Sequence, residues 1–276
     1  MMLNVKTIMR TAVGPACVAA ALLALLAPPA AHAGRSCEAR PPTVQNVQRS
    51  LELAHRMHLA LEASGAQVVL LARAGQDLSR YALRWSHVGW AYRLPAQGDR
   101  PVSWRVVHKL NACGSATGDL YRQGLAEFFL DDPFEYRAAF AIPQPATQQR
   151  MMALLQDTTA VRTAHEPAYS MLAYPWAQRY QQSNQWAIET LARAEVPTAR
   201  SREQAQGWLR AMGFEPTVLR LGALTRLGAR VTAANVAFDD HPNEKRFADR
   251  IETVGADAVF EWLQRAGLAS AAHEVR

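Results

Sequence analysis

The sequence is most informative at first through what it lacks. Its 276 residues include only three cysteines, too few for a small fold held together by several disulfides. It has no block of like charges, no internal repeat and no low-complexity tract. Hydrophobic residues make up 49% and charged residues 20%, as in an ordinary globular protein. This composition excludes disordered, collagen-like and coiled-coil chains.

The N-terminus resembles a secretory signal peptide over residues 1–33. Lys6 and Arg10 form a basic start, and residues 16–27 are an unbroken apolar run. Such a run has the length of a signal core and is too short to span a bilayer as a helix. Ala31-His32-Ala33 then supplies the small-x-small pattern of a cleavage site. An uncleaved anchor is the alternative, and a lipid-modified Cys37 fits less well because the residues before it lack the usual leucine.

Removal of the signal peptide changes the charge balance. The mature chain, residues 34–276, has 276 − 33 = 243 residues and loses two of the 30 basic residues but none of the 24 acidic ones. Its charge is 28 − 24 = +4 instead of +6. Basic side chains are scattered among acidic ones, so no clustered nucleic-acid-binding face is predicted. We expect a periplasmic or secreted protein without a transmembrane span, acting on an envelope substrate or ligand and not on nucleic acid.

Two cysteines remain in the mature chain. Cys37 and Cys113 form an even pair in an exported, oxidising compartment, so a disulfide between them is expected. A nucleophilic or metal-bound thiol is the alternative. Neither cysteine has another cysteine or a histidine two to four residues away, as zinc sites usually require. We expect no metal and no cofactor.

Helical and strand patterns are mixed along the chain. Hydrophobic periodicity predicts helices over about 44–64, 120–130, 148–155, 183–193, 201–213 and 256–267, and strands over about 68–72, 86–92, 104–110, 134–140 and 231–238. No regular strand–helix–strand alternation is present, and no linker marks a second domain. The sequence therefore predicts a single α+β domain over residues 34–276.

Three places could carry chemistry. His87 lies on a predicted strand between small and apolar residues, where an imidazole can act as a base. His108 lies on the next predicted strand, on the same face as Trp104 and Val106. Ser183 opens a predicted helix, whose N-terminus would favour a nucleophile and an oxyanion. Each residue also has a structural interpretation: a buried histidine in the first two cases, a helix N-cap in the third.

A metal-dependent hydrolase is a further hypothesis. Asp239-Asp240-His241 offers three potential ligands within one short segment. Three side chains on one tight turn rarely converge on a single ion, and an Asp-Asp-His-Pro sequence more often forms a loop. We therefore give this hypothesis the least weight.

Four stretches together resemble a bacterial family known as domain of unknown function 2145. They are LARAGQDLSRYALRWSHVGWAYR at 71–93, WRVVHKLNACG at 104–114, GLAEFFLDDPFEYRAAFAIP at 124–143 and YSMLAYPWAQRYQQSNQWAIETL at 169–191. The family is similar to a circularly permuted NlpC-type branch of the papain-like hydrolases. The resemblance implies a small antiparallel sheet packed against helices, with the base on His87, an orienting group on His108 and the nucleophile at position 183.

The nucleophile position departs from the family pattern. The family motif reads Tyr-Gln-Asn-Cys-Asn-Gln-Trp, whereas this chain has Tyr180-Gln-Gln-Ser-Asn-Gln-Trp186, with Ser183 in place of the cysteine. A serine hydroxyl depends wholly on its base, whereas a cysteine is partly ionised at neutral pH. Two hypotheses follow: an amide or ester hydrolase acting on cell-wall peptide or lipid through Ser183, or a non-catalytic member that binds an envelope ligand or protein in the same groove.

Overall fold

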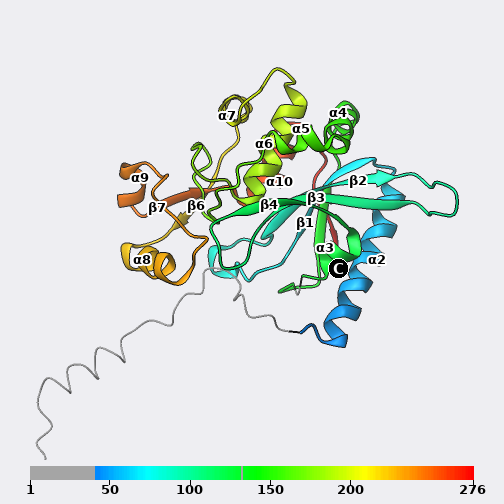
Figure 1. Ribbon diagram of the computed structural model, residues 1–276, viewed down its shortest axis with the longest axis horizontal. Coiled ribbons are helices and arrows are strands. Elements are labelled where there is room, and N and C mark those ends of the chain that lie inside the picture. Colours follow the sequence, from blue (N-terminus) through cyan, green and yellow to red (C-terminus); the bar gives the residue numbers. More distant parts are fainter. Residues whose placement is uncertain (1–40, 132) are drawn as a thin grey trace, which may run out of the picture.

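The computed structural model describes residues 41–131 and 133–276, and its central feature is a six-stranded antiparallel sheet with the strand order β4-β3-β2-β1-β5-β8 (Figure 1). The strands are β1 (Val68–Arg73), β2 (His87–Leu94), β3 (Ser103–Asn111), β4 (Gly118–Gly124), β5 (Ala138–Ala141) and β8 (His273–Val275). Strands β1 to β4 follow one another in space as they do in sequence, and β5 pairs on the other side of β1. Strand β1 is therefore central, and all six of its residues are buried.

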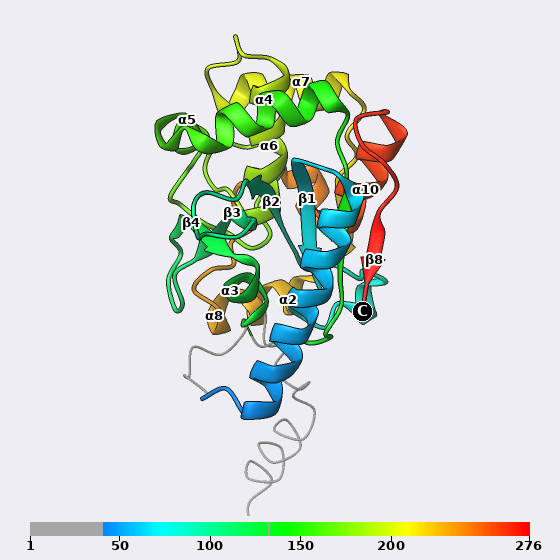
Figure 2. The same cartoon turned by 90° about the vertical axis from the view of Figure 1, so that its right-hand side faces the viewer.

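Helices cover both faces of this sheet. Helix α2 (Val44–Ser64) and the short α3 (Leu125–Phe129) pack on one face, around Val69, Leu71 and Val106. The other face carries Val68, Leu70 and Val88. It is covered by α4 (Pro145–Gln156), α6 (Ser183–Glu195) and α10 (Ala256–Arg265). Figure 2 shows α2 running along the sheet and α4 crossing its end. The buried sheet thus separates two apolar layers.

Helix α6 lies in the middle of the second layer. Eleven of its thirteen residues are buried, from Ser183 to Ala192 and Ala194. Trp90 on β2 donates from its indole N–H to the carbonyl of Ala187, at 2.9 Å. This bond fixes α6 against β2, and α6 also packs on β3. A helix that is buried on nearly all sides holds its N-terminus in a defined position relative to the sheet.

A smaller unit lies beside the main sheet. Strands β6 (Thr217–Arg220) and β7 (Arg250–Thr253) form a two-stranded antiparallel sheet, accompanied by α8 (Ala223–Thr232) and α9 (Asn243–Phe247). Its own apolar cluster contains Leu219, Val236 and Ile251 among others. Figure 1 shows this unit at the end of the molecule opposite α2. The remaining elements are the 3₁₀ turn η1 (Ser79–Tyr81), α5 (Thr158–Arg162) and α7 (Arg202–Ala211).

The structure confirms the α+β class and corrects several element assignments. Residues 120–130, predicted as a helix, form the end of β4 followed by the five-residue α3, because the apolar residues there contact α2 as well as the sheet. Residues 231–238, predicted as a strand, are the end of α8 and a turn. The strand predicted over 134–140 begins only at Ala138. Strands β6, β7 and β8 are three or four residues long and leave too short a pattern to be recognised.

Two expectations concern residues that the structure does not describe. The predicted signal peptide, residues 1–33, and Cys37 both lie outside the described residues. The disulfide between Cys37 and Cys113 therefore stays a prediction. In the described part of the chain, none of the helices combines the length and apolarity needed to cross a bilayer.

Candidate functional site

The two predicted histidines meet on the α2–α3 side of the sheet. His87, the first residue of β2, and His108 on β3 are hydrogen-bonded through His87 Nε2 and His108 Nδ1, at 2.8 Å. His108 shares the sheet face of Trp104 and Val106, as its position in the strand predicted. The opposite ring nitrogen of His108, Nε2, lies 2.8 Å from Oε1 of Gln123 on β4. Three neighbouring strands thus contribute one hydrogen-bonded series.

The series determines which nitrogen of His87 can accept a proton. Gln123 Oε1 can only accept, so His108 Nε2 carries a hydrogen and His108 Nδ1, in the neutral ring, has a free lone pair. His87 Nε2–H then donates to that lone pair. The remaining nitrogen of His87, Nδ1, is left as the basic atom. A base with one nitrogen held by a second polar group is the arrangement that general-base catalysis requires.

Both imidazoles are held neutral. Burial is the main cause that lowers the pKa of His87 well below 6.5, followed by the positive charge of Arg73. The same two causes lower the pKa of His108 to about 3, although the hydrogen bond to Gln123 acts in the other direction. His108 is fully buried and His87 is 8% exposed. At neutral pH the pair therefore carries no charge.

Arg73 provides the positive charge next to the pair. It is the β1 residue directly opposite His87 in the sheet. Its guanidinium donates to the carbonyl of Phe128 and to the carboxylate of Asp131, and it lies over the Phe128 ring at 4.6 Å. The same ring packs against His108 at 5.1 Å. Helix α3, which carries Phe128, thus closes the histidine pair off from solvent on this side.

Ser183 is the first residue of α6 and not its cap. The N-cap is Gln182, whose side-chain oxygen accepts from the backbone N–H of Asn184 at 2.9 Å. The interpretation of Ser183 as a helix N-cap is therefore wrong. The Ser183 side chain does not cap the helix. Ser183 is 5% exposed and lies at the positive end of the helix dipole.

The helix N-terminus and the start of β2 are joined directly. The side chain of Asn184 accepts from the backbone N–H of Val88 at 3.0 Å, and its amide donates to the carbonyl of Val254. Strand β2 pairs with β3 only from Trp90 onward, so the Val88 amide is available to Asn184. Ser183 and His87 each precede one of the two bonded residues, but the His87 ring packs toward Phe128 on the α2–α3 side of the sheet, whereas α6 covers the other side. In the described structure, however, no hydrogen bond joins Ser183 Oγ to His87.

The partner of Ser183 is Tyr169, which the sequence did not single out. The phenolic oxygen lies 3.3 Å from Ser183 Oγ and also takes part in a hydrogen bond with the Ser183 backbone. Burial raises the pKa of Tyr169, while these two bonds act in the other direction. The phenol is therefore protonated at neutral pH. It lies where the first N–H of α6 points, so it is a hydrogen-bond donor beside the candidate nucleophile.

A buried lysine lies under Tyr169. Lys109, on the α6 side of β3, donates to the side-chain oxygen of Gln181 at 3.1 Å and to the carbonyl of Glu166. Its ammonium group is 5.6 Å from the centre of the Tyr169 ring. Burial is the main cause that lowers the Lys109 pKa to about 7. The charge beside the tyrosine therefore changes close to neutral pH.

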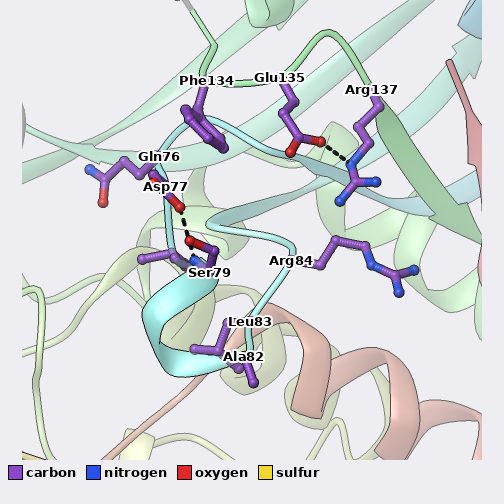
Figure 3. A pocket seen from close by; sticks show the side chains of 10 residues that line it. Gln76, Asp77, Ser79, Ala82, Leu83, Arg84, Phe134, Glu135 and Arg137 are labelled. Atoms are coloured by element: carbon purple, nitrogen blue, oxygen red, sulfur yellow. Dashed lines mark hydrogen bonds and ion pairs between the residues drawn. The ribbon is translucent and has the colours of Figure 1, made fainter.

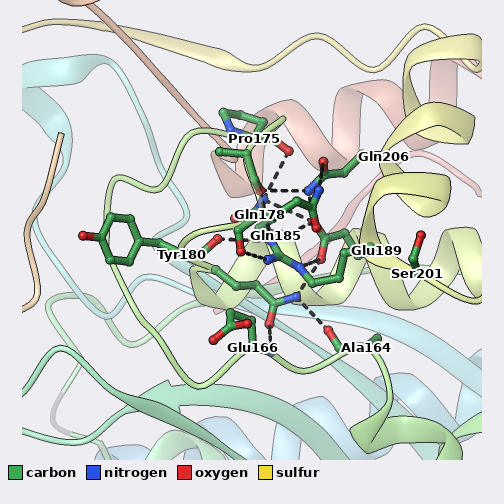
Figure 4. Close-up of polar contacts among 12 residues, drawn as sticks. Ala164, Glu166, Pro175, Gln178, Tyr180, Gln185, Glu189, Ser201 and Gln206 are labelled. Atoms are coloured by element: carbon green, nitrogen blue, oxygen red, sulfur yellow. Dashed lines mark hydrogen bonds and ion pairs between the residues drawn. The ribbon is translucent and has the colours of Figure 1, made fainter. Parts of the chain in front are cut away.

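A buried polar network holds the loop that carries Tyr169 (Figure 4). Its centre is Glu189 on α6, whose carboxylate pairs with Arg202 at 2.8 Å. The same carboxylate accepts from the side-chain amides of Gln181, Gln185 and Gln206. Gln181 in turn binds the Ala164 carbonyl and the Glu166 amide, and Arg202 binds carbonyls of residues 177, 178 and 180. The segment 164–182, irregular in sequence, is thus fixed from both ends.

The Asp239-Asp240-His241 segment serves the fold. Asp240 accepts from His241 Nδ1 at 2.9 Å and from the Tyr174 amide, while His241 Nε2 binds the Glu252 carbonyl. Asp239 pairs with Arg179 at 2.8 Å. Among residues 41–131 and 133–276, no group of three histidine, cysteine or acidic side chains is placed to hold a metal ion. The segment offers no support for the metal-dependent hypothesis.

Two hollows lie on the surface near the η1 turn. One, of about 180 Å³, is lined by residues of the η1 loop, including Asp77 and Arg84, and by Phe134 and Arg137 before β5 (Figure 3). The other, of about 260 Å³, lies between Leu83, Thr217 and the start of α10. His87, His108 and Ser183 line neither of them. All three of these site residues are buried.

The site contains four polar residues that the sequence did not indicate: Gln123, Tyr169, Asn184 and Arg73. The signal for Gln123 was present in the alternation of β4, but apolar residues just after that strand favoured a helix. Asn184 was part of the quoted helix-start motif without a role. Tyr169 and Arg73 also lie in quoted stretches, at 169–191 and 71–93, but without a role, because the segment of Tyr169 has no regular pattern and Arg73 ends an apolar strand.

Comparison with known proteins identifies a family without a defined activity. The model of a family described as an uncharacterised protein conserved in bacteria, domain of unknown function 2145, matches residues 60–263. This match spans more than half of the chain, so the protein belongs to that family. No curated protein and no solved structure matches the chain.

Proposed function

We propose that this member of the domain of unknown function 2145 family is an amide or ester hydrolase in which Ser183 is the nucleophile, His87 the general base and His108 the group that orients it. The observation that carries the proposal is the hydrogen-bonded series from Gln123 through His108 to His87, which leaves His87 Nδ1 as the basic atom of the pair. The residue after His87 is bonded to the residue after Ser183, through the Val88 amide and the Asn184 side chain. A papain-like, NlpC-type arrangement and an exported location belong to the same proposal. They rest on the sequence motifs and on the N-terminal signal pattern.

The neutral histidine pair suits a serine better than a cysteine. A thiol site relies on a thiolate paired with a charged imidazole, whereas a hydroxyl loses its proton only as it attacks and needs a neutral base. Burial and Arg73 keep both rings neutral, so His87 Nδ1 could accept the Ser183 proton once the His87 ring turns from the α2–α3 side of the sheet toward α6. The cost is a weak base, because the same causes oppose the charged imidazolium.

The reaction would proceed in two steps. Ser183 Oγ bonds to the acyl carbon while its proton passes to His87 Nδ1, and the carbonyl oxygen becomes an anion. The N-terminus of α6 and the Tyr169 hydroxyl would stabilise that anion. His87 then returns the proton to the departing amine or alcohol, and water releases the acyl group by the same sequence. Throughout, His108 accepts from His87 Nε2–H and so stabilises the ring when it is charged.

Active-site labelling tests the proposal. A fluorophosphonate probe is expected to label the protein at Ser183, and Ser183→Ala and His87→Ala are expected to abolish labelling and the hydrolysis of activated esters. Ser201→Ala is the matched control, because Ser201 also stands at the start of a helix but is the N-cap of α7. Hydrolysis of peptidoglycan fragments then tests the substrate class. Labelling that persists in Ser183→Ala, or its absence from the unmodified protein, would overturn the assignment.

A second function is favoured by one specific observation. The Ser183 hydroxyl is hydrogen-bonded to Tyr169 and not to His87, and both Ser183 and His87 are nearly closed off from solvent. A non-catalytic protein that binds an envelope ligand through the surrounding surface would have such a site. Ser183→Cys separates the two functions. A gain in ester hydrolysis in this variant supports a competent catalytic site. Binding of peptidoglycan fragments that is equal in the unmodified protein, Ser183→Ala, His87→Ala and Ser183→Cys, with no hydrolysis in any of them, supports the binding function.

A further inference from the structure

Helix α8 has its apolar side facing away from the protein. Leu224, Leu227 and Val231 are 84%, 62% and 77% exposed, whereas Ala229 is the buried residue of the helix. Spacings of three and four residues place these three side chains on one face of an α-helix. A surface helix of a globular protein normally turns its apolar stripe toward the core. The reversed orientation of α8 leaves an apolar stripe in solvent, which marks an interaction surface.

The charges around this stripe have one predominant sign. Helix α8 contains Arg226 and Arg230 and no acidic residue. Arg226 pairs with Asp249, but Arg230 donates to the Val236 carbonyl and not to a carboxylate. Directly before the helix, Arg220 faces Arg250 across the β6–β7 pair, and both are exposed; Arg250 also lies 4.0 Å from the Glu252 carboxylate. The helix that carries the stripe therefore has basic and no acidic side chains, and its Arg230 donates to a carbonyl and not to a carboxylate, which favours an anionic partner.

The small area of the stripe favours a lipid surface over a protein as its partner. A stable, specific contact between proteins buries about 800 Å² on each side. A helix of ten residues is about 15 Å long, and one stripe of three side chains on it covers much less than that area. A lipid surface sets no such minimum, because aliphatic side chains enter it individually and arginines contact the headgroups. The combination of exposed leucines, valine and arginines therefore fits a bilayer surface better than a second copy of the chain.

We propose that α8 binds the surface of an anionic phospholipid membrane, with Leu224, Leu227 and Val231 inserted among the lipids and Arg230 at the headgroups. The position of α8 in the fold gives this binding a consequence. The segment after the helix is bonded to the segment that carries Tyr169, through Ser170 Oγ to the Ala237 amide and carbonyl and through the Met171 amide to Asn235. Binding through α8 would thus hold the candidate site next to the lipid surface. The proposal does not depend on whether Ser183 is catalytic.

Sedimentation with vesicles tests the proposal. The purified protein is mixed with phosphatidylglycerol–phosphatidylethanolamine vesicles or with neutral phosphatidylcholine vesicles, and every variant carries the same N-terminus. We expect binding to the anionic vesicles, and a loss of at least tenfold in Leu224→Asp/Leu227→Asp. Leu59→Asp is the matched control, because Leu59 is exposed on α2, at the opposite end of the molecule. Circular dichroism confirms that the variants keep the fold.

The charge contribution has its own matched pair. Arg230 and Arg265 both lie in the last turn of a helix and donate to a backbone carbonyl. Arg230→Gln is expected to weaken binding to anionic vesicles several-fold, whereas Arg265→Gln leaves it unchanged. Equal binding of the α8 variants and the unmodified protein, or equal binding to neutral vesicles, would overturn the proposal. A concentration-dependent dimer in light scattering that is lost in Leu224→Asp/Leu227→Asp would assign the stripe to a second copy and would also overturn it.

Discussion

At the scale of single residues, the site differs from a reactive cysteine site in its charge. Two imidazoles and a phenol are buried and neutral; Arg73, paired with Asp131, lies beside the imidazoles, and Lys109, whose pKa is lowered to about 7, lies beside the phenol. These surroundings would stabilise a negative charge that develops on a substrate oxygen, whereas burial and Arg73 destabilise a positive charge on His87. Beside Ser183, the Tyr169 hydroxyl and the positive end of the α6 dipole therefore favour an anion in an acyl-transfer reaction.

The histidine pair makes the stability of the protein depend on pH. In the unfolded chain both rings have a pKa near 6.5, whereas in the folded protein the His108 pKa is about 3 and that of His87 is lowered well below 6.5. Below pH 6.5 the unfolded chain therefore binds more protons. The contribution of the two neutral histidines to the free energy of unfolding is complete above that pH. It decreases as the pH falls toward 3, by up to about 1.4 kcal/mol per pH unit for each histidine.

Urea unfolding between pH 7.5 and 4.5 measures this dependence. His108→Gln is expected to reduce the slope of unfolding free energy against pH, because it removes one of the two buried rings. His55→Gln, an exposed histidine on α2, is the control and is expected to leave the slope as it is. An unchanged slope in His108→Gln would contradict the neutral pair.

The contact between His87 and His108 depends on close packing at Gly89. A Cβ atom there would lie 2.9 Å from Val106 Cγ1 and 3.0 Å from the His108 Cβ, closer than side chains approach each other. Gly89→Ala is expected to displace His108 from His87 and to lower the free energy of unfolding by about 1–3 kcal/mol. Urea unfolding and the nitrogen shifts of the two imidazoles measure both effects.

Gly207 on α7 provides the comparison for this substitution. Nothing lies within 4 Å of a Cβ built on it, and a helical alanine is preferred to glycine by about 1 kcal/mol. Gly207→Ala is therefore expected to stabilise the protein slightly. If both variants behave alike, close packing at Gly89 does not control the pair.

At the scale of elements, helix α6 depends on a buried ion pair. Glu189 and Arg202 are both buried, and three glutamine amides complete the shell around the carboxylate. Glu189→Gln would leave the guanidinium without its counter-charge in the interior, which typically costs about 3–5 kcal/mol. Denaturant unfolding measures the loss.

A partly exposed pair serves as the control for that substitution. Glu135 and Arg137 form an ion pair near the surface, and such pairs contribute about 1 kcal/mol or less. Glu135→Gln is expected to change the free energy of unfolding within that limit. A small effect in Glu189→Gln would show that the network positions the loop without stabilising the fold.

The elements differ in how well their sequence patterns predicted them. Strands β1 to β3 and helices α2, α6, α7 and α10 carry patterns long enough to be read, and the alternation in β3 correctly placed His108 with Trp104 and Val106. The contact between His87 and His108 was predictable, because the two residues lie on neighbouring strands. The contact of Ser183 with Tyr169 could not be predicted, because the loop 164–182 is shaped by long-range bonds to Glu189 and Arg202 and not by any local repeat.

At the scale of the whole molecule, the export hypothesis makes a prediction about the N-terminus. Protein recovered from the bacterial envelope is expected to begin at Gly34, and Cys37 and Cys113 are expected to resist a thiol reagent until they are reduced. Reduction should lower the free energy of unfolding by about 3–4 kcal/mol, because the bond would close a long loop. Intact mass measurement before and after reduction checks both statements. A mass that includes residues 1–33, or two reactive thiols, would contradict them.

The separation of the site residues along the chain bears on the order in which the site forms. The bond between His87 and His108 spans 21 residues and that between His108 and Gln123 spans 15, both inside consecutive hairpins. The bond between Val88 and Asn184, by contrast, closes a loop of 96 residues. Short loops close at a lower entropic cost than long ones. The hydrogen-bonded series from Gln123 through His108 to His87 would therefore form before α6 docks on the sheet. The docking of α6, as the last step of folding, would also complete the site.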